Sequence, residues 1–163
     1  PPDAHDTVLL KAAASAHDAA PPQSYGFLNA EEGERVQKLC KENHNGTTIM
    51  KSATGLMEMP VYDPENPSEQ VQEWFEYLEG QGSTREEAEE RIKRYLEREH
   101  ENFADSVARS KPFIEKYDIK TQDELELKSF QWVLGNPDAH TICPSMPNFD
   151  ALDRILPLSG TQL

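Results

Sequence analysis

The short run Pro144–Asn148, which reads PSMPN, has the composition of a loop that could hold a phosphate. Ser145 offers a hydroxyl group, and Asn148 is suited to cap the amino end of a helix that follows it. The backbone N–H groups and the positive dipole end of such a helix attract anions. The residues just before the loop, 139–143, are strand-like. The sequence therefore predicts an anion site between a strand and a helix, where ligands bind in α/β units.

Other reactive side chains lack the spacing that their chemistry would need. The five histidines share no metal-binding motif, and Cys40 and Cys143 are too few for a disulfide framework or a cysteine-held metal cluster. We expect each cysteine to be a small buried hydrophobic residue. Asp3 and His5 have no matched nucleophile. The glutamate-rich run 86–101 lacks the glycine turn of a calcium loop and is interpreted as a solvated helix face. No metal ligand and no catalytic residue is therefore predicted.

Helical and strand-like segments alternate around the candidate loop and would position it. Capping-box patterns, such as Asn29 with Glu32 and Ser83 with Glu86, and apolar residues at helical spacing predict the helices. Runs of β-branched and apolar residues between glycine or proline breaks predict the strands. The predicted helices cover residues 7–16, 29–43, 66–80, 83–109, 112–117 and 121–134, with a last one after residue 148, and the predicted strands lie near 22–27, 47–51 and 139–143. This alternation indicates an α/β fold with a parallel sheet.

Two stretches of the chain resemble the aldo/keto reductase family. Residues 132–148, WVLGNPDAHTICPSMPN, are similar to the end of that family's barrel, where a W-V-L-x-N-P helix leads into the eighth strand and an I-P-G-M-like loop. Residues 25–43, YGFLNAEEGERVQKLCKEN, and 46–55, GTTIMKSATG, resemble its sixth strand, sixth helix and seventh strand. A complete barrel needs about 250 residues. The resemblance therefore implies that residues 1–163 are the C-terminal half of a (β/α)8 TIM barrel, with a large helical insertion at 56–120 between the last two strands.

The resemblance also implies an NADP-binding face. By position, Ser145 and Asn148 would contact the phosphate end of NADPH, and Lys51 would lie beside the cofactor after the seventh strand. Tyr25 would stack on the nicotinamide ring, and Gln23 is a looser amide candidate because its spacing to Tyr25 is one residue off the usual pattern. The structural alternatives are an inherited turn at the loop, a solvated lysine and a half-buried strand tyrosine.

Three positions depart from the family's pattern. The loop arginine of many members falls on Pro147, and the Glu-Asn pair that often holds adenine falls on Arg154 and Ile155. Arg154 could itself contact a phosphate. The family's catalytic tetrad belongs to the first four strands, and nothing in this chain matches them. We therefore expect weak or no nicotinamide cofactor binding by this chain alone, and no reduction of carbonyls.

The sequence is consistent with two functional hypotheses. The first is an aldo/keto reductase-like protein that forms the NADPH side of an oxidoreductase barrel, with the catalytic half supplied elsewhere. The alternative is a non-enzymatic interaction or structural subunit derived from the same fold. The chain begins Pro-Pro-Asp, so we expect a processed product or part of a longer one. Three parallel strands would have open edges, so a missing N-terminal half, another protein chain or self-association is expected to complete the sheet.

The composition excludes some partners. The formal net charge is −14 and the sequence pI is about 4.7, so no basic stripe is available for a nucleic acid. We interpret the acidic excess as a solvated surface. No run of eighteen apolar residues and no secretory signal is present, so we expect no membrane contact and a cytoplasmic location.

Overall fold

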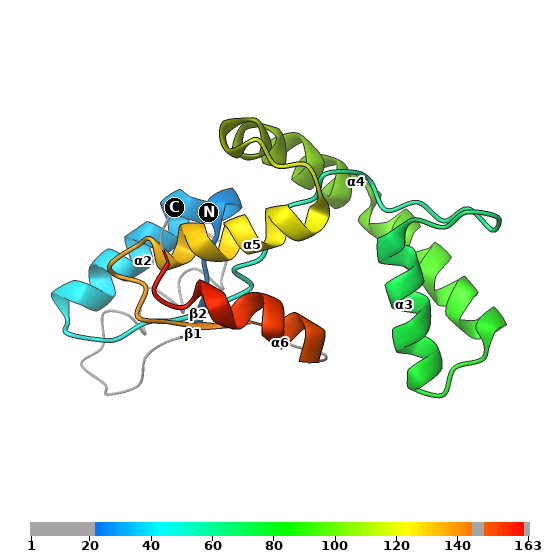
Figure 1. The fold of residues 1–163 in the computed structure, drawn as a ribbon, viewed down its shortest axis with the longest axis horizontal. Helices are drawn as coiled ribbons and strands as arrows, with labels where there is room; N and C mark the ends of the chain where they lie inside the picture. Colours follow the sequence, from blue (N-terminus) through cyan, green and yellow to red (C-terminus); the bar gives the residue numbers. More distant parts are fainter. Residues whose placement is uncertain (1–21, 145–148, 162–163) are drawn as a thin grey trace. The chain divides into compact units, whose positions relative to one another are not determined.

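The computed structural model describes residues 22–144 and 149–161 of the chain. The chain divides into two compact units (Figure 1), which we call the sheet unit and the hairpin unit. The sheet unit comprises Pro1–Gly55 and Phe113–Leu163, and the hairpin unit comprises Leu56–Pro112. The predicted helix at 7–16 lies outside the described residues.

The sheet unit contains three short strands, and helices connect them. The strands are β1 (Pro22–Ser24), β2 (Thr48–Met50) and β3 (Thr141–Cys143). The helical elements are η1 (Phe27–Asn29), α2 (Ala30–Glu42), α5 (Gln122–Leu134), α6 (Phe149–Ile155) and η2 (Leu156–Leu158). The last turns of α4 (Arg85–Tyr117) also belong to this unit. Each strand has three residues, which is shorter than predicted.

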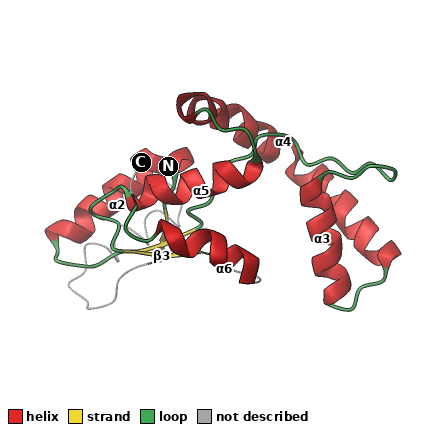
Figure 2. Cartoon of the chain, in the orientation of Figure 1, coloured by secondary structure: helices red, strands yellow, loops and turns green. Residues whose placement is uncertain are grey.

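The sheet is parallel and its spatial order, β1-β2-β3, is the order of the sequence. Ile49 is the central residue and pairs with Gln23 on one side and Ile142 on the other. Connections between adjacent parallel strands are right-handed in nearly all proteins, so successive connections that advance in one direction place their helices on the same face. In Figure 2 the strands lie below α2 and α5. The predicted α/β class and parallel sheet are therefore confirmed. The described residues form no closed barrel.

One face of this sheet is packed and the other is exposed. Tyr25 and Ile49 are buried against Val133 of α5, with Trp132, Ala139 and Ile142 partly buried around them. Side chains alternate between the two faces along a strand. The intervening residues point the other way, and they are exposed: Ser24, Met50, Thr141 and Cys143. Buried parallel sheets are normally covered on both faces.

The two cysteines follow this division. Cys40 on α2 is fully buried, as predicted. Cys143 is exposed, so the prediction that it is a small buried hydrophobic residue was wrong. The physical reason is its position in β3, because it lies opposite Met50 on the face that the helices leave open.

The hairpin unit consists of α3 (Glu69–Gly80) and the first part of α4, joined by a short turn. Its core is Val71, Phe75, Ala88 and Ile92. Gly82 in the turn has φ +91°, a conformation that favours glycine. The capping box of α4 forms one residue later than predicted: the Thr84 N–H donates to Glu87 Oε2 at 2.9 Å, and the Glu87 N–H donates to Thr84 Oγ1 at 3.3 Å.

The helix α4 is also longer than predicted. It continues through Pro112 to Tyr117, where the sequence predicted a break and a separate helix. A proline removes one backbone hydrogen bond from a helix and disfavours the helical conformation at the preceding residue. In compensation, the Phe113 ring stacks on Phe27 with centroids 4.1 Å apart. The structure places the boundary between the two units at this proline, since the hairpin unit ends at Pro112.

Candidate functional site

The carboxyl ends of β1 and β2 lead into two loops that touch each other. A Cβ atom added to Gly26 would lie 2.8 Å from Thr54 Oγ1 and 3.2 Å from the Ser52 carbonyl oxygen. Only glycine fits this approach without a shift of its neighbours, because Cβ contacts below 3.0 Å are essentially never seen. The close approach therefore holds the loop 51–55 against the residues that follow β1.

Asn29 fixes the first of these loops. Its Oδ1 accepts a hydrogen bond from the Gly26 N–H at 2.8 Å, and its Nδ2 donates to the Ser24 carbonyl at 3.0 Å. The side chain makes no capping bond to α2, so the predicted capping box with Glu32 was wrong. The amide instead closes the turn between β1 and α2. This turn lies at the sheet edge where the cofactor site was predicted.

Helix α5 holds the second loop through two side chains. Ser129 Oγ donates its proton mainly to the Leu125 carbonyl at 2.6 Å and also lies 3.3 Å from the Thr54 carbonyl, and Gln122 Nε2 donates to the Gly55 carbonyl at 3.1 Å. Both contacts go to backbone oxygens, so they fix the course of the loop and leave its side-chain hydroxyl groups for other partners. The loop is therefore anchored at its carboxyl end by a helix that also packs on the sheet.

Several buried polar atoms around these loops have no hydrogen-bond partner among the described residues. They are Ser52 Oγ, Thr54 Oγ1 and both amide atoms of Gln23. Ser52 is 1% exposed and Gln23 is 2% exposed. A buried polar group without a partner costs about 1–3 kcal/mol, so native proteins rarely keep one without a use. The two hydroxyl groups come from the loop that also carries Lys51.

Lys51 itself is exposed and has a left-handed backbone conformation, with φ +50°. A non-glycine residue rarely adopts this conformation, and such strain is concentrated at functional sites. A lysine ammonium and two unsatisfied hydroxyl groups within four residues can supply positive charge and hydrogen-bond donors to an anion. The carboxyl edge of β1 and β2 is therefore a candidate anion site.

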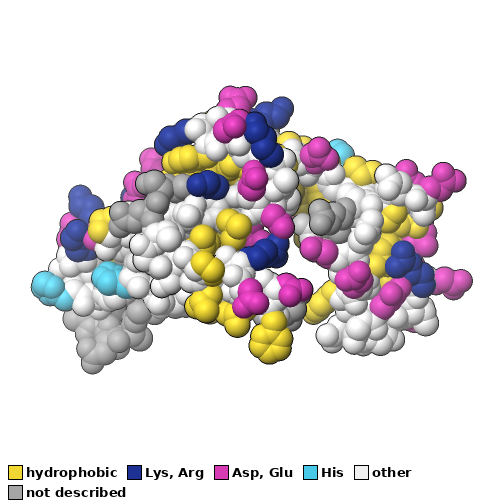
Figure 3. All heavy atoms as spheres, viewed as in Figure 1, with side chains coloured by type: hydrophobic (Ala, Val, Ile, Leu, Met, Phe, Trp, Pro, Cys, Tyr) yellow, Lys and Arg dark blue, Asp and Glu magenta, His cyan; other side chains and the backbone are white. Residues whose placement is uncertain are grey.

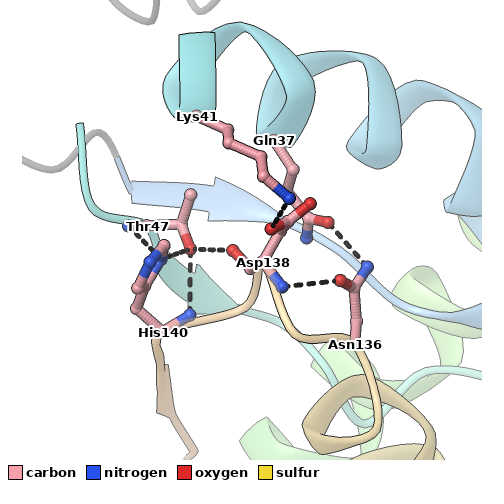
Figure 4. A network of polar contacts seen from close by, with 6 residues as sticks. All are labelled: Gln37, Lys41, Thr47, Asn136, Asp138 and His140. Atoms are coloured by element: carbon pink, nitrogen blue, oxygen red, sulfur yellow. Dashed lines mark hydrogen bonds and ion pairs between the residues drawn. The ribbon is translucent and has the colours of Figure 1, made fainter. Parts of the chain in front are cut away.

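A second polar cluster lies at the opposite, amino edge of the sheet (Figure 4). Thr47 Oγ1 donates to the Asp138 carbonyl at 2.7 Å and accepts from the His140 N–H at 3.1 Å. The Asp138 carboxylate forms an ion pair with Lys41 of α2 at 2.8 Å. The Asp138 N–H in turn donates to Asn136 Oδ1 at 2.9 Å. These contacts join the residues before β2 and β3, so they fix the register of the two strands.

Tyr25 links this cluster to the core. Asn136 Nδ2 donates to the Tyr25 hydroxyl and to Gln37 Oε1, both at 2.7 Å. The Tyr25 ring lies 5.1 Å from the Trp132 ring and is 1% exposed. Burial raises the pKa of the Tyr25 hydroxyl, and the hydrogen bond from Asn136 opposes part of this rise. Tyr25 therefore has a structural role in this conformation.

The structure brings only some of the predicted residues together. Lys51 and Tyr25 follow adjacent strands at the carboxyl edge. Gln23 is buried on the face that packs against the helices. Arg154 lies on α6 and forms an ion pair with Asp123 of α5 at 2.5 Å. Ser145 and Asn148, on the loop after β3, lie outside the described residues.

Sequence reasoning missed the amino-edge cluster and the unsatisfied hydroxyl groups. No contact of Asn136, Thr47 or His140 was predicted from the sequence. The partners of Thr47 lie 91 and 93 residues away along the chain, so no local pattern indicates the contact. Ser52 and Thr54 carried a weak signal, since small polar residues after a buried strand are typical of binding loops.

Comparison of the chain with protein-family models, curated proteins and solved structures finds no match. Over the described ranges, no three histidine, cysteine, aspartate or glutamate side chains are grouped closely enough to hold a metal ion. Within the same residues, no helix has the length and apolar character to cross a membrane.

Proposed function

We propose that this chain forms the cofactor side of an aldo/keto reductase-like barrel and holds the phosphate end of NADP at the carboxyl edge of its sheet. The observation that carries the proposal is the loop 51–55, where Lys51 stands beside the buried, unsatisfied hydroxyl groups of Ser52 and Thr54. Phosphate oxygens carry negative charge and accept several hydrogen bonds, so the lysine ammonium and the two hydroxyl groups could both bind them.

The arrangement of the sheet supports a barrel wall. Strands in sequential parallel order with their helices on one face are the arrangement of a (β/α)8 barrel, in which the other face lines the interior. In this chain that other face exposes Met50 and Cys143. Further strands would cover it. They would come from an N-terminal half, from another chain or from a second copy of this one.

Three further predicted residues would have to join the cofactor site. Ser145 and Asn148 follow β3 in the sequence and lie outside the described residues. Arg154 would have to exchange its ion pair with Asp123 for a phosphate. Bound NADP would supply hydride chemistry, whereas Lys51, Ser52 and Thr54 would bind and orient its phosphate. No tyrosine acid of the family's tetrad is assigned in this chain, so the chain on its own is not proposed to reduce carbonyls.

Titration of the purified chain with NADPH and NADH, followed by calorimetry, tests the cofactor proposal. We expect weak binding of NADPH, with a Kd above about 10 μM, because the loop arginine and the adenine partners are missing. NADH should bind at least about tenfold more weakly, because it lacks the phosphate that Lys51 would contact.

Matched variants make this test specific. Lys51→Ala and Ser52→Ala should each weaken NADPH binding, whereas Lys38→Ala, which removes an exposed lysine from α2, should not. Equal affinity for NADPH and NADH, or full affinity in Lys51→Ala, would show that the loop does not hold the phosphate.

Sedimentation of the purified chain tests the barrel-wall part of the proposal. We expect self-association or non-cooperative unfolding, since one face of the parallel sheet is exposed. A compact monomer that unfolds cooperatively would show that the sheet needs no further strands.

A non-enzymatic interaction subunit remains the second candidate, and the hairpin unit favours it. Tyr77 is 66% exposed there, on the outside of a helix whose inner face is well packed. Large exposed aromatic side chains are enriched at protein interfaces. If NADPH does not bind and the hairpin unit binds a protein segment, the second candidate is supported and the first is not.

A further inference from the structure

A groove in the hairpin unit combines aromatic and basic side chains and no acidic ones. It has a volume of about 480 Å³ and lies between α3 and α4. Its lining consists of three aromatic residues, three arginines and two aliphatic residues. They are Trp74, Tyr77 and Tyr95, then Arg91, Arg94 and Arg98, then Leu78 and Ile92. This composition needs an explanation in a chain of net charge −14.

The charge of the groove contrasts with the rest of the molecule. The chain has 30 aspartate and glutamate residues against 16 lysine and arginine residues, yet three of its seven arginines line this one groove. In the view of Figure 3, acidic side chains are spread over both units. A local concentration of guanidinium groups on an acidic protein creates a small site for a negatively charged partner.

The arginines form a row along one side of α4. Arg91, Arg94 and Arg98 are spaced by three and four residues, so they share a helix face and span about 10 Å along its axis. Arg94 pairs with Glu90 at 2.8 Å, and Arg98 pairs with Glu99 at 2.8 Å. All three arginine side chains are exposed. Exposed pairs of this kind contribute little to stability, so a carboxylate from a partner can replace the glutamates at low cost.

Aromatic side chains in contact with one another lie beside that row. Trp74 contacts Tyr95 edge-on with centroids 5.1 Å apart, and the guanidinium of Arg98 lies over the Tyr95 ring at 5.4 Å. Phe103 supports both rings, at 5.8 Å from Tyr95 and 6.2 Å from Trp74. Tyr77 projects from the opposite helix and is 66% exposed. Tryptophan, tyrosine and arginine are the residue types that dominate the binding energy of protein interfaces.

We propose that this groove is a docking site for an acidic peptide segment of a partner protein, which places carboxylates on Arg91, Arg94 and Arg98 and an apolar side chain on Trp74 and Tyr77. The length of the arginine row favours an extended or helical segment over a single phosphate, because one phosphate cannot contact guanidinium groups spread over about 10 Å. The proposal does not depend on cofactor binding by the sheet unit.

A random 16-residue peptide library displayed on phage, selected against the full chain, tests the proposal. The expected result is enrichment of peptides that carry two or more aspartate or glutamate residues together with an apolar or aromatic residue. The enriched peptide, synthesised with a fluorescent label, then gives a Kd by anisotropy. Absence of enrichment, enrichment without acidic residues, or displacement of the peptides by a single-stranded oligonucleotide would each overturn the proposal.

Charge reversal makes the test specific to the groove. The variant Arg91→Glu/Arg94→Glu/Arg98→Glu should raise the Kd of the selected peptide at least about tenfold. A selection against this variant with the same library should enrich basic peptides. The control Arg35→Glu/Lys38→Glu/Lys111→Glu changes three exposed residues outside the groove and has the same net charge. It should change the affinity less than about twofold, because distant charges are screened by salt. Equal losses in the two variants would overturn the proposal.

A second variant protects the test against misfolding. Tyr77→Ala removes a side chain that is 66% exposed, so it should leave the fold intact by circular dichroism. It should still raise the Kd of the peptide about fivefold or more if the Tyr77 ring binds the partner. An unchanged affinity in Tyr77→Ala, together with an unchanged affinity in the charge-reversed variant, would show that the peptide binds elsewhere.

Discussion

Each of the two units of this chain is stabilised internally by a different kind of contact. The hairpin unit is one continuous stretch, and its core forms between two helices that follow each other in the sequence. The sheet unit is assembled from two separate stretches, and its polar contacts join residues as far apart as Tyr25 and Asn136, 111 positions along the chain. Local pattern therefore indicates the two helices of the hairpin unit, whereas it cannot indicate the long-range contacts of the sheet unit.

The interiors of the two units also differ in the polarity of their buried side chains. The hairpin unit buries mainly apolar side chains, and its buried Ser110 hydroxyl is hydrogen-bonded to Leu56 and Ser106. Its charged groups lie on the surface, for example the pair of Lys93 with Glu89. The sheet unit buries Gln23, Gln37, Thr47 and Ser52, and several of their polar atoms have no hydrogen-bond partner. Apolar packing tolerates substitution of similar volume, whereas a buried polar atom needs a particular partner. Mutations should therefore act on the two units by different mechanisms.

The largest effect is expected in the hairpin core. Phe75 is 1% exposed and packs against Tyr62, with the Arg85 guanidinium over its ring at 3.5 Å. Phe75→Ala should destabilise the hairpin unit by about 3–5 kcal/mol. Hydrogen exchange should show loss of protection in α3 and in the first part of α4, with β2 and α5 unchanged. Equal loss of protection in both units would contradict their separation.

Asn136→Ala should give the next largest effect, and in the sheet unit. The substitution leaves the Tyr25 hydroxyl and Gln37 Oε1 without their donor, and each buried unsatisfied group costs about 1–3 kcal/mol. Chemical denaturation followed by the fluorescence of Trp132, in a Trp74→Phe background, measures the change. As a control, Asn102→Ala removes an exposed amide that donates to Glu99 on the same helix, and it should be near neutral. A near-neutral Asn136→Ala would show that the cluster does not stabilise the sheet.

Gly33→Ala should give a smaller loss of stability. An added Cβ would lie 2.3 Å from Tyr25 Cδ2, so the buried ring must move. Overpacking costs about 1–3 kcal/mol, whereas alanine gains about 1 kcal/mol over glycine in a helix, which leaves a net loss of up to about 2 kcal/mol. Gly80→Ala, where the added atom meets nothing within 4 Å, is the matched control and should be neutral or slightly stabilising. Thermal unfolding of the two variants distinguishes the outcomes.

The smallest effect is expected from acid on the hairpin unit. Hydrogen bonds from Lys93 and Tyr62 lower the pKa of Glu89. A carboxyl whose folded pKa is lowered contributes stability above its unfolded value, near 4.3, and this contribution is lost as the pH falls through the folded pKa. Melting curves between pH 7 and pH 3 should therefore fall slightly less in Glu89→Gln than in the wild type. Identical pH profiles would contradict this contribution.

The sequence could predict the hairpin unit and the class of the sheet unit, but little of the candidate site. The apolar spacing around Val71 and Phe75 predicts a helix at the observed place, and β-branched residues predict β2. The amino-edge cluster depends on contacts that span more than ninety residues, which local spacing cannot indicate. Cys143 illustrates the same limit, since its burial depends on which face of the sheet the helices cover.

The insertion of the hairpin unit into the sheet unit has a consequence for synthesis on the ribosome. Thr47 and its partner Asp138 are separated by 91 residues, so at roughly 5–20 residues per second about 5–18 s pass between their synthesis. During this interval the hairpin unit can fold, because its sequence is continuous. Over the same time β1 and β2, with Tyr25 and Ile49, remain uncovered because α5 has not yet been synthesised. Nascent chains of this protein therefore present unpaired strand edges to one another and to chaperones until the second stretch of the sheet unit has been made.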